Sequence, residues 1–314
     1  MTTTPPRVVA VIAAWNRRDL LREALEALLA QTTALAGIVV VDNGSDDDSA
    51  AVAAATAPDA VVVRFDRNTG GAGGFAAGIA HALELRPDWI WAMDDDTIPT
   101  PSALEALLAT TAALPEVAVA GSRVVWTDGR DHPMNTPRRK PFVGGREARD
   151  AERVGAMPIR STSFVSMLVR ADAVRRHGLP VVDYFLWNDD FEYSTRLLRD
   201  ADGVFVPSSV VLHKTAKFGS TDADPGPRFY WEVRNKLWML RASSSLRPAE
   251  KLLYGGSSVL RWARTVAGSS DRRALREAAV RGWRDGWRTA PRPNAEALAD
   301  QTATAALIAE LERR

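Results

Sequence analysis

Three consecutive carboxylates, Asp94, Asp95 and Asp96, follow directly on the apolar and aromatic run 89–93. That run predicts a buried strand, and carboxylates at the end of a buried strand repel one another and lose hydration unless a positive charge compensates them. A divalent cation would supply this charge, because hard cations prefer oxygen ligands. A solvated acidic turn is the alternative for a cluster that stands alone. Further polar ligands at the same sheet edge would favour the metal site.

A second acidic cluster combines Asp189, Asp190 and Glu192 with the aromatic side chain of Trp187, at the start of a helix predicted over 192–200. The helix dipole favours carboxylates at a helix N-terminus, so capping is the alternative, but capping requires only one or two of them. An aromatic face beside carboxylates suits a sugar, because the ring packs on the face and the hydroxyls donate to the carboxylates. One carboxylate within hydrogen-bonding distance of an acceptor hydroxyl can also act as a general base.

An imidazole and two guanidinium groups follow this cluster. His213 comes shortly after a strand predicted at 203–211, and a lone histidine is usually structural or exposed to solvent. Its place after a buried strand makes it a candidate third metal ligand beside the carboxylates. Arg228 and Arg234 lie at the start of the next predicted helix, where their guanidinium groups could bind a diphosphate.

Alternating apolar strands and amphipathic helices predict a mostly parallel α/β sheet flanked by helices. In such a sheet, ligands bind beyond the carboxyl ends of the strands. Arg17, Asp42 and Asn68 follow the first three predicted strands, so we expect them at one edge, where a nucleotide could bind. Predicted strands cover 8–14, 38–41, 61–65, 89–97, 117–122, 161–170 and 203–211, and predicted helices cover 18–30, 48–57, 76–84, 102–113, 172–177 and 192–200.

A glycine-rich stretch at 68–75 follows the third predicted strand and precedes a predicted helix. Glycines such as Gly70 and Gly71 would let backbone N–H groups approach an anion closely, aided by the helix dipole. The stretch is not a Walker loop, because no Gly-Lys-Ser or Gly-Lys-Thr follows it. A plain flexible turn is an equal alternative.

The composition is that of an ordinary globular protein: of 314 residues, 46% are hydrophobic and 25% are charged. A net charge of +1 gives no reason to expect a nucleic-acid partner. The absence of cysteine excludes disulfides and thiolate metal sites, and it favours a cytoplasmic protein. The apolar run 8–14 is too short for a signal peptide, and no stretch reaches the roughly 20 apolar residues of a membrane span.

The C-terminal part of the chain is basic. Residues 241–314 contain 14 Lys or Arg against 8 Asp or Glu, whereas the first 240 residues carry a net charge of −5. Tryptophan and arginine are interleaved along 246–290, and Trp283 and Trp287 share one face of a predicted helix. This pattern suits an anionic membrane surface; the alternative is that the tryptophans pack on the rest of the protein and the arginines are solvated. A final alanine-rich helix at 295–314 could support a homo-oligomer.

Six stretches of the chain are informative as an ordered set: Val-Asp-Asn-Gly-Ser at 41–45, Asn-Thr-Gly-Gly-Ala-Gly-Gly-Phe at 68–75, Met-Asp-Asp-Asp at 93–96, Trp-Asn-Asp-Asp-Phe-Glu at 187–192, His213, and Tyr-Trp-Glu-Val-Arg-Asn at 230–235. Together they resemble the inverting family-2 glycosyltransferases of the GT-A fold, over roughly residues 7–245. The resemblance is strongest to actinobacterial galactofuranosyltransferases, and rhamnosyltransferases of the same group are close. It implies a Rossmann-like GT-A domain at 1–245 and a basic helical extension at 246–314.

The resemblance also implies a metal site and a donor site. Asp94, Asp96 and His213 would hold Mn²⁺ or Mg²⁺, which would bridge the diphosphate and stabilise the leaving group. Asp42 would contact the nucleotide base and Asp95 would lie toward the ribose. The donor-binding residues as a whole would be Arg17, Asp42, Asn68, Gly70, Gly71, Asp95, Trp187, Arg228 and Arg234.

On the acceptor side, the resemblance implies that Asp190 deprotonates the attacking hydroxyl, with Asp189 and Glu192 positioning sugar hydroxyls. Direct displacement by that hydroxyl would invert the anomeric centre without a covalent intermediate. Asn188 departs from the family pattern, because it stands where an aromatic–acid pair is expected. Asp190 is preferred over Asp189 as the base because it lies closer to the start of the predicted helix.

The leading hypothesis is a metal-dependent inverting transferase that moves galactofuranose from UDP-galactofuranose to a hydroxyl of a glycan or lipid-linked acceptor. Such an enzyme would be peripheral on the inner face of the cell membrane. A dTDP-rhamnose-dependent rhamnosyltransferase is the nearest alternative. A nucleotidyltransferase would require a basic glycine-rich loop after the first strand, and 13–18 contains no glycine. A non-catalytic sugar-binding protein would not need the acids at 94–96 and 189–192.

Overall fold

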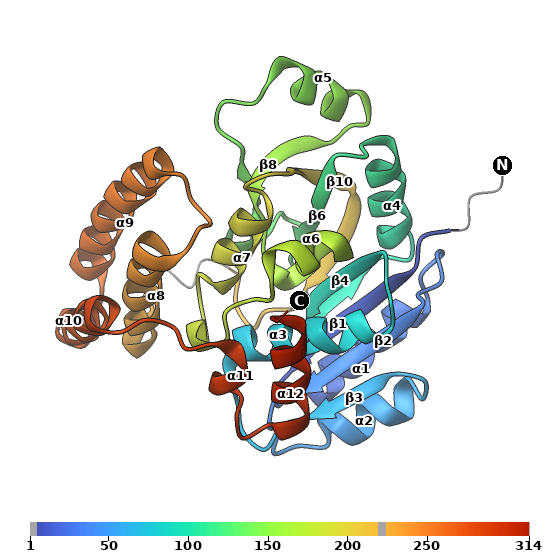
Figure 1. The fold of residues 1–314 in the computed structure, drawn as a ribbon, viewed down its shortest axis with the longest axis horizontal. Helices are drawn as coiled ribbons and strands as arrows, with labels where there is room; N and C mark the ends of the chain where they lie inside the picture. The colour runs from blue at the N-terminus through green and yellow to red at the C-terminus, as the bar shows by residue number, and fades with distance from the viewer. Residues whose placement is uncertain (1–4, 219–223, 314) are drawn as a thin grey trace.

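The computed structural model of the protein describes residues 5–218 and 224–313, and its centre is a ten-stranded sheet (Figure 1). The strand order is β3-β2-β1-β4-β9-β6-β10-β8-β7, and β5 pairs with β10 outside this path. The strands are β1 (Val8–Ala14), β2 (Gly37–Asp42), β3 (Val61–Arg64), β4 (Trp89–Asp94), β5 (Thr97–Pro99), β6 (Val117–Val125), β7 (Arg138–Arg139), β8 (Met157–Ser161), β9 (Met167–Arg170) and β10 (Asp202–His213).

One half of the sheet is parallel, as the sequence predicts. β1 pairs in parallel with β2 and with β4, and β2 pairs in parallel with β3. The registers place Ala14 opposite Asp42 and Ala13 opposite Asp94. The carboxyl ends of β1, β2 and β4 therefore lie at one edge of the sheet, where the polar residues that follow them can meet.

The other half of the sheet is mixed. β9 runs antiparallel to both β4 and β6, whereas β6 and β10 are parallel. The prediction of one strand at 161–170 is wrong, because the chain turns through the short 3-10 helix η2 (Phe164–Ser166) between β8 and β9. β8 then pairs with β10, while β9 lies between β4 and β6. An alternation of apolar residues does not by itself show such a change of partner.

Helices cover both faces of the sheet, because successive side chains of a strand point to opposite faces. Val9 and Val11 of β1 belong to a core cluster with residues of α3, whereas Ala10 and Ile12 belong to another cluster with residues of α1. The helices are α1 (Arg18–Leu29), α2 (Ser49–Thr56), α3 (Gly70–Glu84), α4 (Ala103–Ala113), α5 (Gly145–Arg153), α6 (Ala171–His177), α7 (Asp189–Leu197), α8 (Phe229–Ala242), α9 (Pro248–Gly268), α10 (Arg272–Arg288), α11 (Asn294–Ala297) and α12 (Thr302–Leu311).

Helix α3 contains the glycines that the sequence pattern assigns to a loop. That prediction is wrong from Gly70 onward, because the helix begins there. A Cβ atom at Gly74 would lie 2.8 Å from the Cβ of Ala13, and one at Gly78 would lie 2.4 Å from Cγ1 of Val11. These glycines let α3 approach β1 more closely than larger side chains would allow.

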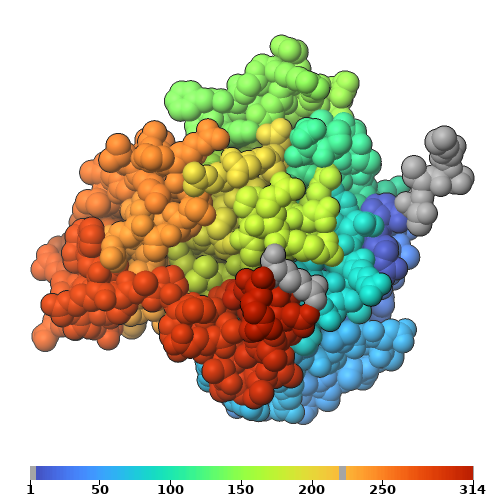
Figure 2. All heavy atoms as spheres, viewed as in Figure 1, coloured from blue at the N-terminus to red at the C-terminus, as the bar shows by residue number. Residues whose placement is uncertain are grey.

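The C-terminal segment packs along one side of the molecule, where it is orange to red in Figures 1 and 2. The boundary predicted at residue 245 falls between α8 and α9. α10 packs on α8, and the chain then returns to α3 through α12. There Oγ1 of Thr304 lies 3.1 Å from Nε2 of His81, and Asp300 forms an ion pair with Arg67 at 2.7 Å.

The last predicted helix, at 295–314, is in fact the two helices α11 and α12. Leu298 and Ile308 from this part are fully buried, in the same core cluster as apolar residues of α3. The chain therefore covers this apolar face itself, and the face gives no support to the homo-oligomer that the sequence suggests.

The sequence leaves two alternatives for the tryptophans of the extension, packing on the rest of the protein or exposure toward a membrane. The structure shows tryptophans of both kinds. Trp262 of α9 packs partly buried against a cluster that includes Leu275 of α10. Trp283 and Trp287 are about half exposed, at 48% and 50%. Among residues 5–218 and 224–313, no helix combines the length and the apolar character that a bilayer-spanning segment requires.

Candidate active site

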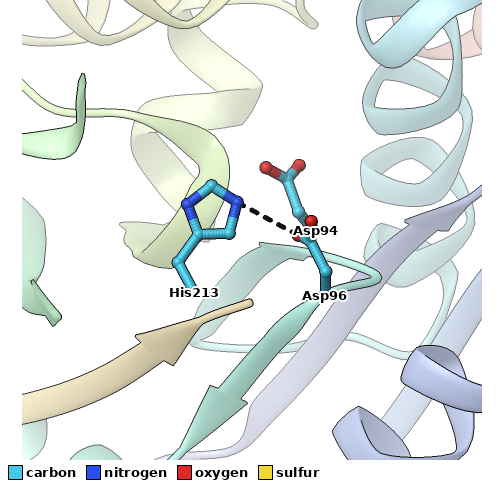
Figure 3. Close-up of side chains that lie close together, drawn as sticks. All are labelled: Asp94, Asp96 and His213. Atoms are coloured by element: carbon cyan, nitrogen blue, oxygen red, sulfur yellow. Dashed lines mark ion pairs between the residues drawn. The ribbon is translucent and has the colours of Figure 1, made fainter. Parts of the chain in front are cut away.

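Two carboxylates and one imidazole meet at the edge where β4 and β10 end (Figure 3). Asp94 is the last residue of β4, Asp96 lies in the turn before β5, and His213 is the last residue of β10. Antiparallel pairing of β5 with β10 places His213 opposite Thr97, next to Asp96. One ligand atom from each of the three side chains lies within 4.8 Å of the other two. The fold thus brings together the three residues that the sequence predicts as metal ligands.

Burial makes the charged forms of Asp94 and Asp95 in this cluster unfavourable, and Arg17 offsets this only in part. Burial raises the pKa of Asp94 to about 7, with the charge of Asp96 adding to the shift, and burial raises the pKa of Asp95 to about 6. Burial also acts on Asp96, but its pKa is lowered because the hydrogen bond and charge of His213 outweigh that effect. A divalent cation would offset the repulsion among these carboxylates.

The ring of His213 is held in a metal-binding orientation. Its Nδ1 lies 2.9 Å from Oδ1 of Asn135, and an amide oxygen can only accept, so Nδ1 donates. Nε2 faces Asp96, whose nearest oxygen is 3.1 Å away. Burial opposes the charged ring, but the hydrogen bond and charge of Asp96 raise the pKa of His213. A bound cation would take the place of the proton on Nε2. Metal-binding histidines usually donate their second N–H, as Nδ1 does here. Two carboxylates and this imidazole fit a cation such as Mn²⁺ or Mg²⁺.

Two of the predicted donor contacts, Arg17 and Asp95, contact each other. One carboxylate oxygen of Asp95 accepts from the guanidinium of Arg17 at 3.0 Å, and the other accepts from the backbone N–H of Trp15 at 2.9 Å. The same guanidinium lies 2.5 Å from Asp96. These bonds fix the loop after β1 beside the carboxylate cluster, and the contacts of Arg17 and Asp95 with a nucleotide stay a prediction.

Asp42, the predicted base contact, and Asn68, a predicted donor-binding residue, support turns at the same edge. Asp42 is fully buried, and its Oδ1 accepts from the backbone N–H of Ser45 at 3.1 Å. Oδ1 of Asn68 accepts from the backbone N–H of Gly70 at 2.7 Å. Both side chains therefore have structural partners, and their roles toward a nucleotide stay predictions.

Two N–H groups at the N-terminus of α3, where the glycines suggest an anion site, already have partners, and the predicted contacts of Gly70 and Gly71 with a donor stay predictions. The N–H of Gly70 is bonded to Asn68, and the N–H of Ala72 donates to the carbonyl oxygen of Phe185 at 3.3 Å. Gly70 has φ of +75°, and a Cβ there would lie 2.0 Å from that same carbonyl oxygen. Gly70 thus permits the close approach of the turn at Phe185, whereas Gly71 lines the cavity described next.

A cavity of about 480 Å³ joins the metal ligands to the second acidic cluster. Its wall includes Asp94 and His213 at one end, and Trp187, Asp189 and Asp190 from the start of α7. The fold therefore places both acidic clusters, which lie far apart in the sequence, around a single space.

The two adjacent carboxylates of α7 have different surroundings. Burial raises the pKa of Asp189 well above its ordinary value, and the charge of Asp190 adds to this. Burial also raises the pKa of Asp190, but the backbone N–H of Phe191 and the positive charges of Lys236 and Arg138 act against it. Asp190 is half-buried, whereas Asp189 is buried. Asp190 is therefore ionised more readily than Asp189.

The turn before α7 has an uncommon backbone. Phe185, Trp187 and Asn188 have φ angles of 61°, 66° and 62°, in a backbone region that residues other than glycine rarely adopt. The buried amide of Asn235 on α8 donates to the carbonyl oxygens of Leu186 and Trp187, at 2.9 and 2.8 Å. Such strained turns persist when their surroundings hold them, and they often occur at functional sites.

The role predicted for Glu192 is wrong. Glu192 is only 2% exposed, and both of its oxygens accept from the guanidinium of Arg196, at 2.9 and 3.0 Å. The hydroxyl of Ser243 donates to one of the same oxygens at 2.5 Å. The physical reason is Arg196, which lies one turn further along α7 and binds this carboxylate inside the protein. Glu192 therefore stabilises the interior and is not placed to bind a sugar.

The diphosphate contact predicted for Arg234 is also not supported. Its guanidinium donates to the carbonyl oxygen of Asp183, and it lies over the rings of Trp231 and Trp238, at 4.4 and 3.8 Å from their centroids. Arg234 thus holds the segment before the strained turn. Arg228 is exposed at the end of a short 3-10 helix, η4 (Gly226–Arg228), and its contact with a diphosphate stays a prediction.

Four residues that sequence reasoning did not assign lie in the cavity wall. Asn135 and Arg138 come from the segment between β6 and β8, which is rich in Gly, Pro and Arg but has no motif that marks single residues. Glu232 and Arg261 come from α8 and α9, which meet only in the folded chain. No local pattern distinguishes these two from surface charges.

A mostly parallel sheet flanked by helices, with carboxylates at the end of β4 beside a histidine at the end of β10, is the arrangement of a GT-A glycosyltransferase. The family model described as "Glycosyl transferase family 2" matches residues 9–175. The chain belongs to glycosyltransferase family 2, as the sequence predicts.

Two mycobacterial galactofuranosyltransferases are similar to this chain in sequence. The chain is 31% identical over 198 residues to the galactofuranosyltransferase GlfT1 of Mycolicibacterium smegmatis, covering 61% of this chain and 65% of that protein. It is 30% identical over 250 residues to the galactofuranosyltransferase GlfT1 of Mycobacterium tuberculosis H37Rv, covering 74% of this chain and 82% of that protein.

Solved structures confirm the fold. The chain superposes on Staphylococcus aureus TarS 1-349 in complex with UDP-GlcNAc with a TM-score of 0.63 and 13% identity, covering 98% of this chain and 90% of that one. The mannosyltransferase PcManGT from Pyrobaculum calidifontis, in complex with GDP-Man and Mn²⁺, gives a TM-score of 0.56 and 17% identity, covering 99% and 87%. At such identities the likeness shows the fold alone.

Proposed function

We propose that the protein transfers galactofuranose from UDP-galactofuranose to a hydroxyl of a glycan or lipid-linked acceptor, with inversion at the anomeric carbon. One observation carries the proposal: Asp94 and His213, which form a triad with Asp96, line the same cavity as Asp189 and Asp190. The similar galactofuranosyltransferases of mycobacteria support the choice of donor over dTDP-rhamnose, which stays the alternative.

The proposed site has a metal end and an acceptor end. Asp94, Asp96 and His213 would hold Mn²⁺ or Mg²⁺, which when bound would neutralise the negative charge of the departing diphosphate. At the acceptor end, Asp190 accepts the proton of the attacking hydroxyl. The hydroxyl oxygen bonds to the anomeric carbon, the bond to the phosphate oxygen breaks with its electron pair, and UDP leaves. A single displacement of this kind inverts the anomeric centre.

Asp189 takes a different part in this scheme. The shift of its pKa well above the ordinary value favours the neutral form, which can donate a hydrogen bond to a sugar oxygen. Trp187 offers an aromatic face in the same cavity. Asp189 and Trp187 thus position the sugar, while the more readily ionised Asp190 accepts the proton.

We further propose that the C-terminal helices place the enzyme at an anionic membrane surface. Four apolar side chains of α9 are more than half exposed and lie on one face, because positions seven apart in a helix nearly coincide. α10 adds Trp283 and Trp287 beside a row of arginines. The apolar residues are Leu252, Leu253, Val259 and Leu260.

A thermal-shift panel of nucleotide sugars, with and without Mn²⁺, tests the proposed function. A donor that binds the native state raises the melting temperature, so we expect the largest rise with UDP-galactofuranose plus Mn²⁺. A larger rise with dTDP-rhamnose would replace the donor, and no rise with any nucleotide sugar would contradict the proposal. His213→Ala should remove the part of the rise that depends on Mn²⁺.

A further inference from the structure

The carboxylate of Glu232 joins three elements at the wall of the active-site cavity. Glu232 lies in the first turn of α8 and is buried. Its Oε2 accepts from Nδ2 of Asn188, just before α7, at 2.7 Å. Its Oε1 accepts from Nε1 of Trp262 at 3.0 Å and from the guanidinium of Arg261, both on α9. One side chain therefore links the C-terminal extension to the turn that leads to Asp190.

Asn188 is the point at which this link acts on the site. It is buried, has a left-handed backbone, and immediately precedes Asp189 and Asp190. Asn235, three residues after Glu232 on α8, holds the carbonyl oxygens on the other side of the same turn. Because α8 contacts the turn through both a side-chain amide and a carboxylate, it sets where the first residues of α7 point.

Arg261 extends the link into the cavity itself. It lines the cavity wall, and its side chain is 35% exposed, so it is open to solvent and still held by Glu232. The metal end of the cavity is built separately, from residues at the ends of β4 and β10. Glu232 is bonded to Asn188 beside Asp189 and Asp190, and Arg261 is bonded to Glu232, so their contacts lead to the start of α7.

We propose that Glu232 is a positioning residue for the acceptor end of the site, and that α9, through Arg261, completes the surface against which the acceptor binds. This rests on the glycosyltransferase activity proposed above. It makes the C-terminal extension necessary for acceptor use but not for nucleotide binding.

Glu232→Gln in the full-length chain tests this. The carboxamide has one accepting oxygen, so it cannot accept from Asn188 and from the donors of α9 at the same time. We expect the Kd for UDP with Mn²⁺, measured by calorimetry, to stay within about twofold, and kcat/KM for an alkyl glycoside acceptor to fall about 10- to 100-fold. Turnover is followed as UDP released from UDP-galactofuranose, or from the donor that stabilises the protein most.

Two further variants separate positioning from folding. Asn188→Gly keeps the left-handed backbone available but deletes the amide that Glu232 holds, and it should also lower acceptor kcat/KM. Arg261→Met should raise the acceptor KM more than it lowers kcat. Arg264→Met, a matched change at an exposed arginine of the same helix, should leave both values unchanged.

Several results would overturn the proposal. These are unchanged turnover in Glu232→Gln, an equal loss of UDP affinity and turnover, or the same behaviour of Arg261→Met and Arg264→Met. Failure of the proposed function looks different, because the unaltered protein would then release no UDP with any donor and acceptor pair.

Discussion

Asp189 and Asp190 are neighbours whose surroundings give them different chemistry. A general base must be ionised and must reach the proton, and Asp190 is the carboxylate with nearby positive charges and partial exposure. We expect Asp190→Asn to lower the transfer rate about 100-fold or more, because the amide cannot take the proton. The Kd for UDP with Mn²⁺ should change little. Asp200→Asn, at an exposed acid after α7, is the control, and near-normal transfer by Asp190→Asn would remove the base assignment.

The pH dependence of transfer offers a second test at this residue. Burial raises the pKa of Asp190, so activity should fall on the acid side at a higher pH than for an exposed carboxylate. Lys236 is a cation that lowers this pKa, so Lys236→Met raises it further and should move the acid limb of kcat/KM to higher pH. Arg138 and Asp189 are unchanged in this variant. Lys217→Met removes an exposed positive charge instead, and an identical profile for both variants would contradict the assignment.

The sequence predicts individual residues well where a strand end dictates their place. Asp94, Asp96 and His213 each end or follow a buried strand, and parallel or paired strands carry such residues to one edge. Glu192 and Arg234 could not be assigned in this way, because their roles depend on the side of a helix they occupy. That side is fixed by packing partners such as Arg196, which the local sequence does not reveal.

At the scale of elements, the contact between α3 and the turn before α7 is the critical one. Gly70 allows this contact, since a Cβ there would meet the carbonyl oxygen of Phe185 at 2.0 Å and φ is +75°. We expect Gly70→Ala to lower the free energy of unfolding by about 3 kcal/mol, from the left-handed backbone and the overpacking together. It should also lower transfer, because the displaced turn leads into Asp190. Urea unfolding and the transfer assay measure the two effects.

The control for this prediction is the same substitution in another helix. Gly256 lies inside α9, and a Cβ there would have no heavy atom of the described residues within 4 Å, apart from its chain neighbours and the backbone of its own helix. Gly256→Ala should therefore stabilise the protein by about 0.5–1 kcal/mol, because alanine loses less backbone freedom than glycine. Equal effects of the two substitutions would show that the close approach at Gly70 does not matter.

Helix α3 also shows which elements could not be predicted from the sequence. Four glycines after a strand are typical of a loop, but the chain forms a helix that packs closely on β1, where Gly74 meets Ala13 and Gly78 meets Val11. Likewise, apolar alternation at 161–170 gave no sign that β8 and β9 have different partners. Long-range contacts determine both outcomes, whereas the parallel strands with their own apolar runs are predictable.

At the scale of the whole molecule, the site draws on more of the chain than the family model covers. That model ends at residue 175, yet the cavity is completed by the start of α7, by His213 and by Glu232 and Arg261. The sequence predicts a basic extension that binds a partner of its own, but it does not predict that α9 forms part of the cavity. Its charge pattern describes the outer face of these helices and carries no information about the inner one.

The outer face of the extension gives the last prediction. Leu252 and Leu260 of α9 are 81% and 61% exposed on one face, close in sequence to the arginine-rich α10. Apolar side chains that insert between lipids gain about 1.5 kcal/mol each, and arginines add attraction to anionic headgroups. The full-length protein should therefore co-sediment with vesicles that contain phosphatidylglycerol, less so at high salt, and poorly with phosphatidylcholine alone.

Leu252→Ser/Leu260→Ser should weaken binding about 10-fold or more, whereas Leu29→Ser, at an exposed leucine of α1, should not. Binding that is unaffected by the double variant, or a concentration-dependent dimer that the variant abolishes, would assign this face to another partner.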